Sequence, residues 1–243
     1  MLVINADDFG RSVKETDAAM DCYQAGRVTS VTAMVFMKDS ERAAKLAIAN
    51  TISTGLHLNL TERFAAVSLS SELTKRHERV ARFLTRAKYS SLIYNPKLSN
   101  DFRYIYEAQI EEFIRLYGHP PSHIDGHQHQ HLCTNMLLDT VIPRGMKVRR
   151  TFHFWAGEKN LANRAYRGAL NKLVKSRHPG TDYFFALIQS LDRMRMVKVL
   201  ELARQRSIEI MTHPANPPER EYLLSDGFGT MLNTVVLGDY DNL

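Results

Sequence analysis

Short apolar runs alternate with longer amphipathic stretches along most of the chain. The runs that predict strands lie at 2–5, 28–36, 52–60, 123–126, 146–150, 183–187 and 208–212. Segments with helical periodicity lie at 12–24, 39–49, 101–117, 161–176 and 191–205, and a further helix is expected after Thr134. Because parallel neighbours need crossover connections, this alternation predicts an α/β fold, a single distorted (β/α) barrel of about seven parallel strands. We expect one domain over residues 1–243.

Local signals mark several helix boundaries. Ser12 and Glu15 form the pattern of a capping box, and Gly26 is a typical residue for ending the helix that follows. Asp39 is expected to cap the second helix, and Gly118 to end the helix at 101–117.

Residues 62–100 interrupt the alternation of strands and helices. This segment is polar, basic and weakly periodic. We interpret it as an insertion or lid over the strand ends, and we expect it to influence substrate choice.

The composition is that of a globular domain. The chain has 243 residues, of which 44% are hydrophobic and 24% are charged, so it can bury a sizeable core. No apolar run approaches the roughly 18–20 residues of a membrane span, and the N-terminal residues lack the basic and apolar regions of a secretory signal. Two cysteines, Cys22 and Cys133, cannot form a disulfide framework. We therefore expect a cytoplasmic protein without a transmembrane segment.

The net charge of +6 arises from two basic segments, 75–88 and 144–177. Neither segment has a recognised nucleic-acid module or an aromatic platform for stacking bases, so we expect no nucleic-acid partner. A solvated basic face remains one interpretation. Attraction towards an anionic substrate or a membrane surface is the other.

Residues with metal-binding or acid–base chemistry follow four of the predicted strands. In parallel α/β folds, the carboxyl ends of the strands meet at one face, where active sites lie. The segments would therefore bring their side chains together, although they are far apart in sequence. The residues concerned are Asp7, Asp8, His57, His127, His129, His131 and His213.

Each motif by itself has more than one interpretation. The adjacent carboxylates of Asp7 and Asp8 repel each other, and a cation would remove that cost, but either residue could instead cap the next turn. His57, among leucines, could be a hydrogen-bonded core residue. His213 could be a loop histidine, or a second catalytic group opposite an acidic base.

The segment HIDGHQHQH, at 123–131, is the densest of these motifs. Histidine or aspartate occupies every second position, and in an extended chain such residues share one face. Metal or proton chemistry explains this cluster better than packing does. Adventitious metal binding by a surface segment remains an alternative.

Four motifs together resemble the YdjC-like carbohydrate deacetylases, a group with chitooligosaccharide and hopanoid-associated branches. They are NADDFG at the N-terminus, GLHLNLT at 55–61, HIDGHQHQH at 123–131 and MTHPA at 211–215. The resemblance implies a distorted barrel similar to that of the polysaccharide deacetylases. It also implies hydrolysis of N-acetyl groups from amino sugars or short oligosaccharides with a divalent cation, and it suggests a homodimer.

The resemblance also assigns roles by position. It implies that Asp8, His57 and His127 bind the metal, that Asp7 is the catalytic base, that His213 is the acid, that His129 and His131 line the pocket, and that Arg149 orients Asp7 or the substrate. Two imidazoles and one carboxylate favour Zn²⁺ or another transition ion, whereas the family resemblance suggests Mg²⁺.

Three other functions remain alternatives. The first is a metal-dependent phosphoesterase on a similar barrel, which usually needs more carboxylates and a second metal. The second is a deacetylase that acts on a lipid-linked or anionic glycan at the membrane surface. The third is a binding protein without catalysis, against which the presence of an acid and base pair argues.

Overall fold

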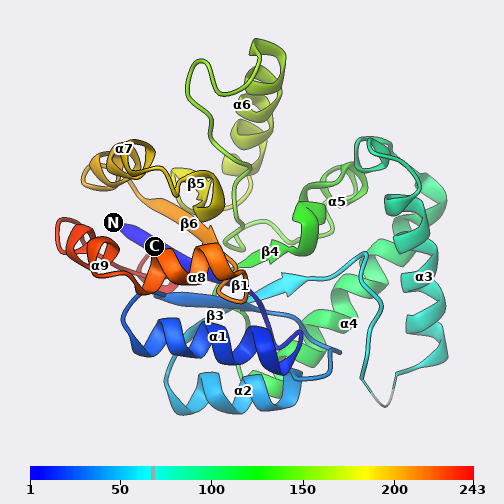
Figure 1. The fold of residues 1–243 in the computed structure, drawn as a ribbon. Helices are drawn as coiled ribbons and strands as arrows, with labels where there is room; N and C mark the ends of the chain where they lie inside the picture. Colours follow the sequence, from blue (N-terminus) through cyan, green and yellow to red (C-terminus); the bar gives the residue numbers. More distant parts are fainter. Residues whose placement is uncertain (67–68) are drawn as a thin grey trace.

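The computed structural model, which describes residues 1–66 and 69–243, contains one curled sheet of six parallel strands (Figure 1). The strand order is β4-β3-β2-β1-β6-β5. The strands are β1 (Leu2–Phe9), β2 (Ser30–Ala33), β3 (Ser53–Leu58), β4 (Ile124–Gly126), β5 (Tyr183–Ala186) and β6 (Ile208–Thr212). The predicted α/β fold with a parallel sheet is therefore confirmed, with the sheet forming half of a barrel.

The seventh strand predicted at 146–150 does not form as a ladder. Val148 makes only an isolated bridge with Ile124, whose backbone bonds to Lys147 (2.9 Å) and Arg149 (3.0 Å). The Val148 N–H points to the other side and donates to the Pro179 carbonyl (3.0 Å). The same segment continues to β5, where the His153 N–H donates to the Phe184 carbonyl (2.9 Å). An irregular segment thus contacts both edge strands, and a full seven-stranded barrel is not confirmed.

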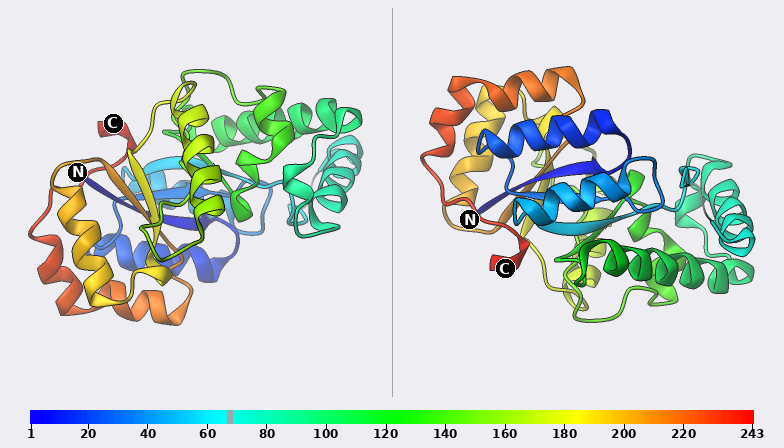
Figure 2. Two further views of the ribbon diagram at one scale, coloured as in Figure 1. Left: turned by 90° about the horizontal axis from the view of Figure 1, so that it is seen from above. Right: turned by 90° about the horizontal axis from the view of Figure 1, so that it is seen from below.

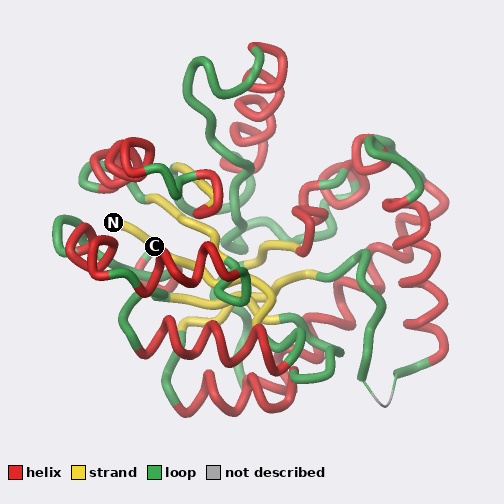
Figure 3. Tube along the Cα trace, viewed as in Figure 1, coloured by secondary structure: helices red, strands yellow, loops and turns green. Residues whose placement is uncertain are grey.

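Helices surround the sheet, which lies in the interior (Figure 3). The larger helices are α1 (Val13–Gln24), α2 (Ser40–Ala49), α3 (Ser71–Thr85), α4 (Ser99–Tyr117), α6 (Leu161–Lys175) and α7 (Arg193–Ala203). Shorter ones are α5 (Thr134–Leu138), α8 (Pro217–Leu224) and α9 (Asp226–Leu232). Every helix predicted from periodicity is present.

The helix ends agree with the sequence only in part. The predicted capping box is wrong, because the Ser12 hydroxyl donates to the Glu15 carboxylate and does not cap a backbone N–H. Asp39 precedes α2 without capping it, since its carboxylate accepts two hydrogen bonds from Arg42 (2.8 Å each). Gly26 ends α1 as predicted, with a left-handed φ of 68° that glycine adopts readily.

Much of the segment at 62–100 is regular, contrary to its weak periodicity. Ser70 caps α3 by accepting a hydrogen bond from the Leu73 N–H (3.0 Å), and α3 packs on α4. Arg76 and Arg79 both bind Asp101, so part of the basic segment at 75–88 is paired within the protein. Figure 2 shows that this helical arm extends from the sheet on the side opposite both termini. Residues 67–68 of the predicted insertion lie outside the described residues.

One large hydrophobic cluster runs from Leu2 to Leu232, so both ends of the chain contribute to the same core. Cys22 and Cys133 are both buried and unpaired. Among the residues that the structure describes, no helix has the length and apolar character needed to cross a membrane. The cytoplasmic location and the homodimer stay predictions.

Candidate metal centre and active site

Asp7 and Asp8 lie within β1, near its carboxyl end, and not beyond it as predicted. The pairing of β1 with β2 is irregular between Ala6 and Phe9, and Asp8 has a left-handed φ of 64°. This irregularity changes the direction of successive side chains. The two neighbouring carboxylates therefore contact different groups.

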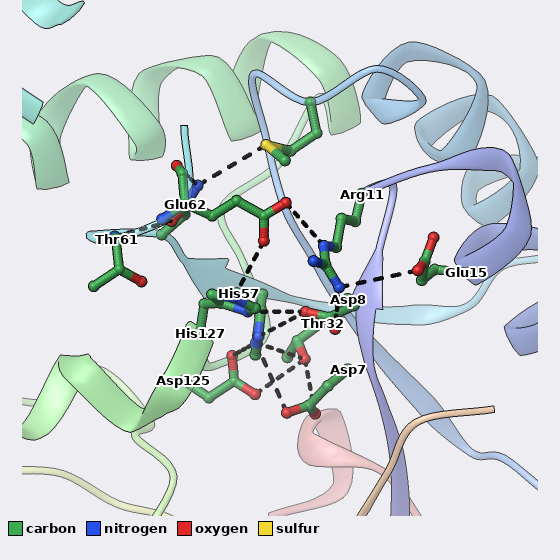
Figure 4. A network of polar contacts seen from close by, with 12 residues as sticks. Asp7, Asp8, Arg11, Glu15, Thr32, His57, Thr61, Glu62, Asp125 and His127 are labelled. Atoms are coloured by element: carbon green, nitrogen blue, oxygen red, sulfur yellow. Dashed lines mark hydrogen bonds and ion pairs between the residues drawn. The ribbon is translucent and has the colours of Figure 1, made fainter. Parts of the chain in front are cut away.

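Asp8, His57 and His127, called the metal group below, come together as predicted. Asp8 Oδ1 lies 3.3 Å from His57 Nε2 and 3.1 Å from His127 Nδ1 (Figure 4). The three potential ligand atoms all lie within 4.8 Å of one another. A tetrahedral ion with ligand bonds of about 2.0–2.2 Å holds its donors roughly 3.3–3.6 Å apart. The spacing and the donor types therefore fit one divalent cation.

Two carboxylates that were not assigned from the sequence hold these histidines in place. Asp125 Oδ1 lies 2.7 Å from His57 Nδ1, and Glu62 Oε2 lies 3.2 Å from His127 Nε2 (Figure 4). Since a carboxylate accepts, each contact fixes a proton on that nitrogen and leaves the nitrogen facing Asp8 free to bind a cation in the neutral imidazole. Asp125 pairs with His57 in the β3–β4 register, so correct strand pairing could have found it.

The charge of this group favours cation binding. Burial raises the pKa of Asp8, but its hydrogen bonds with His127 and His57 lower it more, so the pKa lies well below its usual range. Burial lowers the pKa of His57, but Asp125 and Asp7 raise it well above its ordinary value. A cation would replace the His57 proton as the partner of Asp8.

Asp7 is bound mainly by Arg149, and His57 Nδ1 lies 3.9 Å from Asp7 Oδ2. Arg149 Nη1 and Nη2 each donate to one Asp7 oxygen at 2.7 Å, and Asn5 Nδ2 donates to Oδ1 at 3.0 Å. Burial raises the pKa of Asp7, but Arg149 and His57 lower it to a net value well below normal. Asp7 is thus an oriented, ionised carboxylate beside the metal group.

Arg149 also connects Asp7 to a buried network that the sequence gave no reason to expect. Its Nη1 lies 2.6 Å from Asp125, and its Nε donates to Glu209 at 2.7 Å. Tyr240, near the C-terminus, donates its hydroxyl proton to Glu209. Burial raises the pKa of Glu209 to about 7, although Arg149 opposes this shift.

His213 lies in a cavity of about 350 Å³ whose lining includes Asp7 and Asp8. Glu219 accepts a hydrogen bond from the His213 backbone N–H (3.0 Å) and lies 3.7 Å from Nδ1. Burial lowers the pKa of His213, but Glu219, Asp7 and Asp8 raise it to a net value above normal. An ionised carboxylate and a histidine that retains its proton therefore line the same cavity.

The prediction that the histidines of 127–131 share one face is wrong. Gln128 and His129 have left-handed φ values of 53° and 58°, so the chain turns after β4 and is not extended. His131 is buried, with Nε2 3.3 Å from the Arg149 carbonyl. His129 packs against Phe152, with 4.6 Å between the ring centroids.

The parallel sheet and the ligands at its carboxyl edge define an α/β protein with a candidate mononuclear metal centre. The chain belongs to the YdjC-like family, whose sequence model matches residues 1–234. The resemblance noted from the four motifs is therefore confirmed.

Relatives of the chain include named deacetylases. It is 28% identical to a chitooligosaccharide deacetylase of Yersinia pestis over 223 residues, which are 88% of this chain and 81% of the relative. It is 34% identical to a carbohydrate deacetylase of mouse over 132 residues, which are 54% of this chain. The match to the mouse protein spans only 43% of that relative's length.

The fold also resembles a solved structure. A protein from Enterococcus faecalis, described as a cellobiose-phosphate cleavage protein, superposes with a TM-score of 0.72. The match covers 99% of this chain and 97% of that protein at 19% identity. This likeness supports the fold alone.

Proposed function

We propose that this protein is a metal-dependent carbohydrate deacetylase, which hydrolyses an N-acetyl group from an amino sugar or a short oligosaccharide. The proposal rests on one observation: Asp8, His57 and His127 converge beside Asp7, and His213 lines a cavity with Asp7 and Asp8. The names of the relatives from Yersinia and mouse support the same reaction.

One divalent cation would be held by Asp8, His57 and His127. Zn²⁺ or another transition ion suits this donor set, and Mg²⁺ is the choice suggested by the family resemblance. When bound, such an ion supplies a Lewis acid that polarises the amide carbonyl and makes water more acidic. Asp125 and Glu62 orient the two imidazoles towards it.

The remaining steps are proton transfers by the chain's own residues. Asp7, held by Arg149, accepts a proton from the water whose oxygen attacks the amide carbon. His213 donates a proton to the nitrogen as the carbon–nitrogen bond breaks. Acetate and a free amino sugar result. The raised pKa of His213, to which Glu219 contributes, keeps it in the acid form that this step requires.

The alternatives receive less support. A two-metal phosphoesterase would need a second set of ligands. The other two candidate groups in the described part of the chain, Asp7–His57–Asp125 and His123–Asp125–Glu209, have carboxylates that bind Arg149. The membrane-surface alternative rested on the basic segments, one of which is partly paired with Asp101.

Acetate release tests the proposal. N-acetylated mono- and oligosaccharides are assayed with added Zn²⁺, Mg²⁺, Co²⁺ or Ni²⁺, and metal content is measured in each variant. Asp7→Asn should abolish turnover and retain the metal, whereas His127→Ala should lose the metal. Asp226→Asn, at an exposed position of α9, is the matched control. Turnover by Asp7→Asn, or a full complement of metal in His127→Ala, would contradict the assigned roles.

A further inference from the structure

A second cavity, of about 260 Å³, lies between α6 and the turn that follows His127. Its lining comes from three parts of the chain: the short helix η1 (Ser90–Leu92), the turn after β4, and the region from Thr151 through α6. In Figure 1, α6 rises from the sheet on one side of β4, and α5 and α3 lie on the other side. The proposed reaction does not use this cavity.

The turn after β4 connects this cavity to the metal centre. His127 belongs to the metal group, and the next three residues, Gln128, His129 and Gln130, line the second cavity. Two successive non-glycine residues in the left-handed region are unfavourable, and they persist only where the surroundings hold them. The turn therefore places polar side chains in the cavity within a few residues of the reacting centre.

Several polar groups in the cavity have unused hydrogen-bonding capacity. Gln130 Oε1 is buried without a partner among the described residues. Arg167 donates from Nε to Asn163 (2.9 Å) and from Nη1 to Thr151 (2.6 Å). Within residues 1–66 and 69–243, no carboxylate lies within ion-pair distance of this guanidinium. Arg167 is thus a half-buried cation that retains donors for a ligand.

Aromatic side chains form the apolar part of the wall. Phe152 lies against His129, and the Arg167 guanidinium carbon lies 5.6 Å from the centre of the Phe152 ring. Tyr166, which is 48% exposed, also lines the cavity from α6. Flat apolar faces next to a few fixed donors and acceptors suit a sugar ring, whose C–H faces are apolar and whose hydroxyl groups are polar.

We propose that this cavity is a subsite for the sugar unit next to the one that carries the reacting acetamido group. The inference rests on the proposed function and extends it, because it makes the number of sugar units in the substrate a determinant of activity. The volume is below the roughly 300–1,000 Å³ of pockets that enclose a drug-sized ligand, so it suits one ring. Arg167 and Gln130 then bind hydroxyl oxygens and hydrogens of that ring, and Tyr166 packs on its face.

The test compares N-acetylglucosamine with its β-1,4-linked dimer. In Arg167→Ala, the ratio of kcat/KM for the dimer to that for the monomer should fall about 10–100-fold, the loss expected for a hydrogen bond with a charged group. In Tyr166→Ala the same ratio should also fall, because the aromatic face that packs on the ring is removed. Arg164→Ala, on the same helix outside the cavity lining, is the matched control and should keep the wild-type ratio. Equal losses on both substrates, or an unchanged ratio, would overturn the proposal.

A binding measurement separates this proposal from the proposed function. Calorimetry with the fully deacetylated dimer should show binding to the wild type and at least tenfold weaker binding to Arg167→Ala. If the wild type releases no acetate but binds the dimer through Arg167, the proposed function fails and the subsite remains. If the wild type releases acetate but Arg167→Ala binds the dimer as tightly as the wild type, the subsite assignment fails alone.

Discussion

Replacing Arg149 by methionine removes the cation that lies among three buried carboxylates. Arg149 is fully buried, and it lies 2.7 Å from Asp7, 2.6 Å from Asp125 and 2.7 Å from Glu209. Methionine retains much of the side-chain volume, so the change tests the charge more than the packing. The carboxylates would remain in an interior without their partner.

The expected loss follows from the cost of leaving a buried charge unpaired. Removing one partner of a buried ion pair destabilises a protein by about 3–5 kcal/mol. The loss should not multiply with the number of carboxylates, because Glu209, whose pKa burial raises to about 7, becomes neutral on protonation. For a chain of this size, about 2–4 °C in Tm per kcal/mol gives a decrease of roughly 6–20 °C.

Urea unfolding followed by circular dichroism, together with the Tm, measures this loss. Arg82→Met, at an exposed position of α3, is the matched control and should stay within about 0.5 kcal/mol of the wild type. Adding Asp7→Asn to Arg149→Met should recover part of the stability, because one uncompensated carboxylate is removed. A loss below about 1 kcal/mol in Arg149→Met would refute this account of the buried network.

Three other variants test separate parts of the structure. Asp125→Asn should weaken metal binding about 10–100-fold, measured by chelator competition, because Asp125 orients His57. Glu219 raises the pKa of His213, so Glu219→Gln should lower that pKa. The alkaline limb of the pH profile of kcat should then move to lower pH. Burial lowers the pKa of His77 to about 4, so its contribution to stability is present above about pH 6.5 and is lost as the pH falls. Relative to His77→Leu, the wild type should lose about 2 kcal/mol between pH 7 and 5 in urea unfolding.

Each of these variants has an outcome that contradicts its premise. Unchanged metal affinity in Asp125→Asn would mean that the contact with His57 does not orient the ligand. An unmoved or raised alkaline limb in Glu219→Gln would remove His213 as the titrating acid. Parallel pH dependence of the wild type and His77→Leu would show that His77 titrates normally in the folded protein.

The convergence of Asp8, His57 and His127 was predictable because each of these candidate ligands lies at or beside the carboxyl end of a recognisable strand. Asp8, His57 and His127 come from three separate segments, and the topology of a parallel sheet brings such ends to one edge. The lateral order β4-β3-β2-β1 then determines that His57 and Asp125 are neighbours, and the alternation pattern alone does not give that order.

The conformation of the segment at 127–131 was not predictable from its alternating pattern. Alternation predicts an extended strand, but Gln128 and His129 adopt left-handed φ values, which their residue types disfavour. The packing of His129 against Phe152 and the contact of His131 with the Arg149 carbonyl offset that preference. The same turn contributes His127 to the candidate metal centre and His129 to the lining of the second cavity.

The sequence by itself determined the order of strands and helices along the chain, and it identified the residues whose chemistry suits a metal and an acid–base pair. These features depend on hydrophobic periodicity and residue type, which are local properties. Only the tertiary structure decided that Arg149 joins Asp7 to Glu209 and Tyr240, and that Glu62 contacts His127. Those contacts join residues far apart along the chain, and their energies depend on burial, which exists only once the sheet has curled and the helices have packed around it.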